Sequence, residues 1–234
     1  MCMFVILYED GQPDHRGSSS VSQCAGYFIR FTMAVSLLAS GLSTAIAQSA
    51  STMACGKLEN AYGPFDYTNP SDREKKLPIV EKFHFTPSVE TLVHGNSSTV
   101  AKDLDYTLRA FPNHHRALYA MLRYQLKNKG PAGARYTIEC YFDRALRLAP
   151  KDGEVYVLYG IYLHRKGDYP EALEKYQQAE ALLPDSGDLH YNLGLLYVDT
   201  KKYDLAKQEA DKAYASHYPL PGLMIKLKRH GFYK

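Results

Sequence analysis

Four histidines in the first half of the chain are the side chains best suited to chemistry: His84, His94, His114 and His115. Neutral imidazoles are common metal ligands. Adjacent residues of a helix point about 100° apart, so His114 and His115 are poorly placed to bind one ion together. The sequence has no His-x-x-x-His or Cys-x-x-Cys motif. We therefore expect no metal and no other cofactor. The alternative is a periplasmic protein that binds a metal or a small molecule through the histidines of the first half of the chain.

Other catalytic signatures are missing from the sequence as well. It has no glycine-rich phosphate-binding loop and no Gly-x-Ser-x-Gly motif, and Asp103 and Asp105 have the spacing of ordinary acids on a helix surface. A formal net charge of +3 is too small to favour nucleic acid. Hydrophobic content of 45% with 23% charged residues is that of a globular protein. We predict neither enzymatic activity nor a nucleic-acid partner.

The first 47 residues have the pattern of an export signal. Arg30 precedes an apolar run that starts at Phe31 and ends in Ala45-Ile46-Ala47, a small-x-small sequence of the kind that signal peptidase cleaves. We predict that residues 1–47 are a leader and signal peptide, and that the exported protein keeps no membrane span. The periplasm is the expected compartment. An uncleaved membrane anchor is the alternative.

Removal of this leader leaves two cysteines, Cys55 and Cys140. Two cysteines in an oxidising compartment can pair. Closing so long a loop stabilises a fold by about 4–5 kcal/mol in the chain-entropy model. We favour a disulfide. The alternative is two free thiols, with Cys140 filling a small position in the core.

The stretch from Gly153 to Leu220 repeats itself. Residues 153–186 align with residues 187–220, and identical residues recur 34 positions apart: Gly160 with Gly194, Ala172 with Ala206, and Ala179 with Ala213. A fixed period of this size, filled with helix-forming residues, predicts stacked helical hairpins. The small residues would let the two antiparallel helices of a hairpin approach closely.

The residues between the two helices of the first hairpin predict that the first helix ends, the chain turns, and the second helix begins. Gly167 can adopt the left-handed conformation that ends a helix. Asp168 can cap the next helix with its side chain, and Glu171 would complete a capping box. Pro184 is suited to end that helix.

This pattern resembles the tetratricopeptide repeat (TPR), whose signature positions are filled by Gly160, Ala172, Tyr176, Ala179 and Pro184. The resemblance covers residues 86–220, as two degenerate repeats followed by two clear ones. It implies an all-α fold, a short right-handed solenoid of antiparallel helix pairs, of the kind found in exported bacterial TPR proteins. Residues 221–234 would form a capping helix at the C-terminal end.

Residues 48–85 lack the repeat. The segment is rich in proline and in aromatic residues, among them Tyr62, Phe65 and Tyr67, and residues 77–85 alternate enough to form a short strand. We expect an extended strap over the first helices. The alternative is that the three aromatic rings enter the groove of the solenoid or bind a partner.

The TPR resemblance also implies a function, since such solenoids commonly bind a peptide or a helix in a concave groove lined by the first helix of each pair. We therefore expect a protein-interaction adaptor or scaffold of the cell envelope. The residues expected to contact the partner are Arg116, Tyr119, Arg123, Lys127, Val157, Ile161, His164, Arg165, Tyr191, Asn192 and Leu195. With the neighbouring acids Glu154, Asp188 and Asp199, this surface runs from basic in the second unit to apolar and acidic in the fourth, which suits a peptide with an acidic end and an apolar middle. The alternative is an ordinary solvated inner face.

Overall fold

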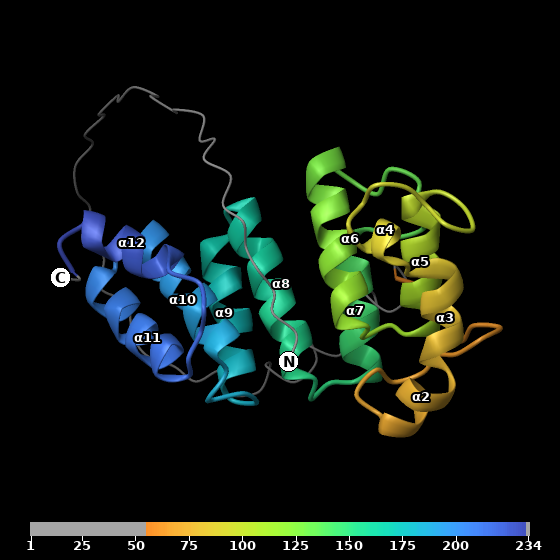
Figure 1. Cartoon of the computed structure of the whole chain (residues 1–234), viewed down its shortest axis with the longest axis horizontal. Helices are drawn as coiled ribbons and strands as arrows, with labels where there is room; N and C mark the ends of the chain where they lie inside the picture. The colour runs from red at the N-terminus through yellow and green to blue at the C-terminus, as the bar shows by residue number, and fades with distance from the viewer. Residues whose placement is uncertain (1–54, 233–234) are drawn as a thin grey trace, which may run out of the picture.

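The computed structural model describes residues 55–232, so the predicted signal peptide and its cleavage site lie outside the described residues. Within this range the secondary structure is entirely helical (Figure 1). The first helices are α2 (Pro70–Lys75), α3 (Leu77–His84), α4 (Pro87–Glu90), α5 (Val100–Ala110), α6 (His115–Asn128) and α7 (Ile138–Leu148). They are followed by α8 (Gly153–Lys166), α9 (Tyr169–Glu180), α10 (Gly187–Asp199), α11 (Tyr203–Ala215) and α12 (Gly222–Arg229). None of these helices has the length and apolar character needed to cross a membrane.

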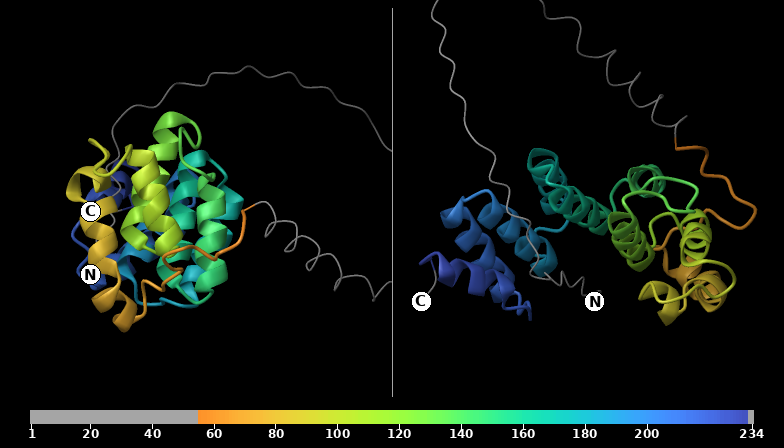
Figure 2. Two further views of the ribbon diagram at one scale, coloured as in Figure 1. Left: turned by 90° about the vertical axis from the view of Figure 1, so that its right-hand side faces the viewer. Right: turned by 90° about the horizontal axis from the view of Figure 1, so that it is seen from above.

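Successive helix pairs stack in a row. Helix α8 packs along α9 and α10 along α11, while α9 also contacts α10. The first helices of consecutive pairs touch as well, α6 with α8 and α8 with α10. Helix α12 packs against both α10 and α11 at the end of the row. Figures 1 and 2 show this order from the side and from above. The described part of the chain is thus the expected all-α solenoid.

The repeated small residues lie where two helices meet most closely. A Cβ atom on Gly160 would lie 2.5 Å from Cε1 of Tyr176, and one on Gly194 would lie 2.5 Å from Cδ2 of Leu223. Ala172 and Ala179 are fully buried. The predicted reason holds for Gly160, where a larger side chain would clash with the partner helix α9, whereas at Gly194 the clash would be with the capping helix α12.

The turn between α8 and α9 is only partly as predicted. Gly167 ends α8 with φ of 91°, the left-handed conformation expected of it. Asp168 precedes α9, but its side chain makes no capping hydrogen bond. Its carboxylate instead lies 3.0 Å from Nζ of Lys166. The capping-box prediction is wrong, because the carboxylate of Asp168 pairs with Lys166 instead of capping α9.

The short strand predicted at residues 77–85 is the helix α3. Leu77 and Val80 are buried together, as expected of residues three apart on one face of a helix, whereas Ile79 and Phe83 are exposed on another face. The apolar residues of this segment fit both a two-residue and a helical period. The segment forms a helix because its buried face packs against α5.

The segment before α2 is an extended strap, as predicted. Arg144 of α7 is almost fully buried, and its guanidinium donates hydrogen bonds to the carbonyl groups of Cys55 and Lys57. Further along, the N–H of Phe65 donates to the carbonyl of Ala110 at 2.8 Å. The aromatic rings of the strap pack with α3 and the end of α5 in a small second core, not in the groove. A disulfide joins Cys55 to Cys140 of α7 and fastens the start of the strap.

Candidate functional site

The predicted partner-binding residues lie on three neighbouring helices, α6, α8 and α10, each the first helix of its pair. Helix α6 carries Arg116, Tyr119, Arg123 and Lys127; α8 carries Val157, Ile161, His164 and Arg165; α10 carries Tyr191, Asn192 and Leu195. We call this set of residues, together with the neighbouring acids Glu154 of α8 and Asp188 and Asp199 of α10, the inner face.

At one end of the inner face, two arginines approach the same tyrosine. The guanidinium carbon of Arg123 lies 5.0 Å from the ring centre of Tyr119, and that of Arg165 lies 5.9 Å from it. Both distances are in the range of cation–π attraction. A nitrogen of Arg165 also lies 3.5 Å from the hydroxyl of Tyr119. This contact bridges α6 and α8 and concentrates positive charge beside an aromatic ring.

Not every cation of the inner face is available to a partner. Nε of Arg116 donates to Glu90 of α4 at 2.8 Å, and this hydrogen bond holds the pKa of Arg116 above its usual range. Arg123 donates to the carbonyl group of the same Glu90. Lys127 and Arg165, in contrast, are exposed. Glu90 is absent from the predicted set because it lies 26 positions before Arg116, and no local pattern in the sequence links the two.

The apolar members of the inner face are part of the hydrophobic core. Val157 and Ile161 are completely buried and Leu195 is 2% exposed. The ring of Tyr191 packs on that of Tyr218, with centroids 4.6 Å apart. The exposed members of the predicted set are thus the charged residues.

The acidic end of the inner face is neutralised within the protein. Asp199 lies 2.9 Å from Nε2 of His164 and 3.3 Å from Nζ of Lys226, which comes from α12. Burial disfavours the ionised carboxylate of Glu154 and thereby raises its pKa. The inner face therefore departs from the predicted gradient, because its exposed charge is positive.

Asn192 is a buried polar residue with an unfilled hydrogen-bonding position. Its side chain is fully buried and its Nδ2 donates to the carbonyl oxygen of Asp188 at 2.8 Å. Its Oδ1 has no hydrogen-bond partner among the described residues. A buried acceptor without a donor costs about 1–3 kcal/mol.

Three of the histidines considered above, His84, His114 and His115, each have a separate structural partner. His114 caps α6 by accepting the N–H of Ala117 at Nδ1, and burial lowers the pKa of this imidazole. Nε2 of His115 lies 2.8 Å from Asp152. His84 pairs with Asp103 at 2.9 Å. These contacts give each of the three histidines a structural partner of its own.

Among the described residues, one group has the spacing of metal ligands: Glu180, His190 and Glu209. The ammonium group of Lys212 lies 2.9 Å from Glu209 and 3.4 Å from Glu180, so a cation of this chain already neutralises both carboxylates. His190 faces Glu209 through Nδ1 and the carbonyl of Pro184 through Nε2, both at 2.7 Å. Two acceptors around one ring favour the protonated imidazole.

This pair predicts a pH-dependent contribution to stability. The hydrogen bond with Glu209 raises the pKa of His190. Burial opposes ionisation of Glu209, but hydrogen bonds from His190 and Lys212 outweigh it and lower the pKa of that carboxyl. Because the folded pKa of His190 is above its unfolded value, its stabilisation is complete below the unfolded pKa, near 6.5. It is lost as the pH rises through the folded pKa.

We expect the free energy of unfolding of the wild type to exceed that of His190→Gln most at about pH 6. The difference should shrink as the pH rises towards 9, and urea titrations across this range measure it. A difference that does not change with pH would show that the imidazole is neutral in the folded state.

Two family models match the second half of the chain. A model described as TPR repeat matches residues 160–200, and one described as tetratricopeptide repeat matches residues 141–174. Residues 141–200 are thus similar to tetratricopeptide repeats. The matches include three of the four helices in which the 34-residue period was found, α8, α9 and α10, and together with the row of helix pairs they support an all-α TPR solenoid. The chain therefore contains a protein-interaction module. No curated protein matches the sequence.

Proposed function

We propose that the inner face of this TPR solenoid binds an acidic segment of a partner protein, as an extended peptide or a helix. The observation that supports this most is the exposed Arg165 beside Tyr119, with Lys127 exposed on the same helix as Tyr119. Arginine and aromatic residues are the types that contribute most to protein interfaces. The acids of the inner face are paired or buried, so the exposed cations are left to attract a partner's carboxylates.

In this arrangement the exposed cations of α6 and α8 contact acidic side chains of the bound segment, whereas Asn192 of α10 is fully buried within the solenoid. The protein would act as an adaptor or scaffold without enzymatic activity.

We further propose that the protein works in the periplasm. The apolar run that ends in Ala47 has the features of an export signal. The Cys55–Cys140 disulfide suits an oxidising compartment. Mass spectrometry of the purified protein tests the export signal, since cleavage after Ala47 would leave Gln48 as the first residue. An intact N-terminus in the membrane fraction would instead support a membrane-held scaffold.

Reversing the exposed charge of the inner face should abolish partner binding without unfolding the protein. In the variant Lys127→Glu with Arg165→Glu, both replaced side chains are exposed, so we expect an unchanged melting temperature. Partner capture from an extract of the cells that make the protein should fall by about tenfold or more. Arg123 is left intact because it also holds the carbonyl group of Glu90.

The matched control is Lys75→Glu with Lys202→Glu, which makes the same change of charge at two exposed lysines outside the inner face. This control should capture the partner as the wild type does. Equal loss in both variants would indicate that net charge, not the inner face, determines binding. Undiminished capture by the first variant would place the binding surface elsewhere.

A further inference from the structure

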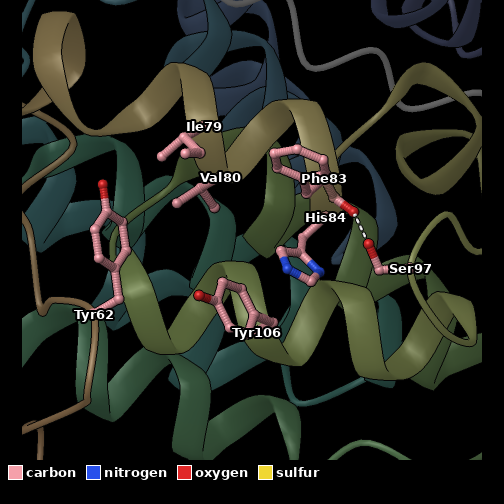
Figure 3. Close-up of a pocket in the computed structure, with 7 residues that line it drawn as sticks. All are labelled: Tyr62, Ile79, Val80, Phe83, His84, Ser97 and Tyr106. Atoms are coloured by element: carbon pink, nitrogen blue, oxygen red, sulfur yellow. Dashed lines mark hydrogen bonds between the residues drawn. The ribbon is translucent and has the colours of Figure 1, made fainter.

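A cleft of about 370 Å³ lies between α3 and α5, away from the inner face. Its lining is mostly apolar (Figure 3): Ile79, Val80 and Phe83 come from α3, Tyr106 from α5 and Tyr62 from the strap. Ile79 is 52% and Phe83 45% exposed, which is unusual for large apolar side chains that serve only packing. Volume and lining are those of small-molecule sites, which typically occupy about 300–1,000 Å³.

One wall of this cleft is held rigidly. Oδ1 of Asp103 lies 2.9 Å from Nδ1 of His84, and Oδ2 of Asp103 accepts the N–H groups of residues 96–98. The hydroxyl of Ser97 donates to the carbonyl of Phe83 at 2.6 Å, as drawn in Figure 3. The loop before α5 is thereby fastened to the end of α3. The cleft is consequently formed before any ligand binds.

His84 presents its second ring nitrogen to a ligand. Its imidazole stacks on the ring of Tyr106, with centroids 3.8 Å apart, which fixes the plane of the ring. Nδ1 is taken by Asp103. Among the described residues, Nε2 has no hydrogen-bond partner. This nitrogen is a polar contact point in an otherwise apolar lining.

A second cleft continues from the first and adds positive charge. The two share His84, Ser97 and Tyr106, and the second is also lined by Lys102, Arg109 and Arg135. Lys102 and Arg135 are exposed and make no ion pair within the described part of the chain.

The two carboxylates of the second cleft already have ion-pair or hydrogen-bond partners within the protein. Asp105 lies 2.9 Å from Nε of Arg109 and also accepts the hydroxyl of Tyr141. Asp103 is taken by His84 and three backbone N–H groups. The charge left for a ligand is therefore the positive charge of Lys102 and Arg135.

We propose that these two clefts together bind a small amphiphilic carboxylate, with an aromatic ring or short aliphatic chain between α3 and α5 and its carboxylate at Lys102 and Arg135. The apolar part would contact Ile79 and Phe83, and the neighbouring cations select an anion over a neutral molecule. Because Tyr62 stands on one side of the lining and Ser97 on the other (Figure 3), the space suits one ring or a short chain. The site is independent of the inner face and of its protein partner.

Titration of the full chain with 4-phenylbutyrate and with its neutral amide, followed by calorimetry, tests this proposal. We expect saturable binding of the acid, with at least about tenfold weaker binding of the amide. Lys102→Gln with Arg135→Gln should reduce the affinity for the acid to that for the amide and leave the amide unaffected. Ile79→Ser with Phe83→Ser should weaken both ligands by about tenfold or more. All four replaced side chains are exposed, so the melting temperature should not change.

The control is Ile225→Ser on α12, which removes an isoleucine of similar exposure, 45%, far along the chain from the cleft. It should bind the acid as the wild type does. Absence of saturable binding at millimolar acid would overturn the proposal. Equal affinities of the wild type for acid and amide would overturn the anion site, and binding that survives the double serine substitution would overturn the apolar site.

Discussion

Gly160→Leu is expected to lower the free energy of unfolding by about 1–3 kcal/mol or more, because it overfills the contact between α8 and α9. A Cβ atom at this position would already lie 2.5 Å from Cε1 and 2.6 Å from Cδ1 of Tyr176. Tyr176 is fully buried, so its ring cannot move aside without displacing other core residues. Urea unfolding monitored by circular dichroism measures the change.

Gln177→Leu is the matched control, because it places the same side chain at an exposed position of α9 beside Tyr176. Surface changes of this kind are usually within about 0.5 kcal/mol of the wild type. If Gly160→Leu were as harmless as this control, α8 and α9 would not approach as described, and the repeat register would be wrong.

Loss of the disulfide is the second large effect that we expect. Cys55 and Cys140 are 85 positions apart, and in the chain-entropy model a loop of that length stabilises the folded state by about 4–5 kcal/mol. Cys55→Ser with Cys140→Ser should lose most of this stabilisation. Guanidinium titrations of the variant and of the oxidised wild type compare the two.

The loss should be greatest in the strap. Arg144 still donates hydrogen bonds to the carbonyl groups of Cys55 and Lys57 in the variant, but the covalent link to α7 is gone. We therefore expect limited proteolysis to cut the variant within residues 55–69 before it cuts α8–α11. Equal midpoints for the variant and the oxidised wild type would mean that the bridge does not constrain the unfolded chain.

The second half of the fold could be predicted from the sequence because its decisive contacts are local. Gly160 meets Tyr176 only 16 positions later, within one repeat, whereas the equivalent Gly194 meets Leu223 of the capping helix α12. The first half is different. The structure of residues 77–85 depends on the contact of α3 with α5, and the apolar residues alone fit a strand equally well. The hydrophobic pattern distinguishes a strand from a helix only when the two-residue and the helical period predict different buried residues.

The position of the inner-face residues on the first helices of neighbouring pairs could be predicted from the sequence, but which of their charges remain exposed could not. Which cations remain exposed depends on ion pairs with distant elements. Arg116 forms an ion pair with Glu90 of α4, and Asp199 forms one with Lys226 of α12. These pairs join residues 26 and 27 positions apart, where no short-range pattern identifies them. The cleft between α3 and α5 was likewise hidden, because it requires the strap, α3 and α5 to meet.

The most direct test of the proposed function is photocrosslinking at single positions of the full chain. Benzoylphenylalanine in place of Tyr119 samples the inner face, and the same residue in place of Tyr169, a 38% exposed tyrosine on the second helix of its pair, samples a surface outside it. We expect one dominant protein crosslinked at position 119 and not at position 169. The same crosslink should disappear when Lys127→Glu and Arg165→Glu are added. Crosslinks only at position 169, or equal ones at both, would contradict binding at the inner face.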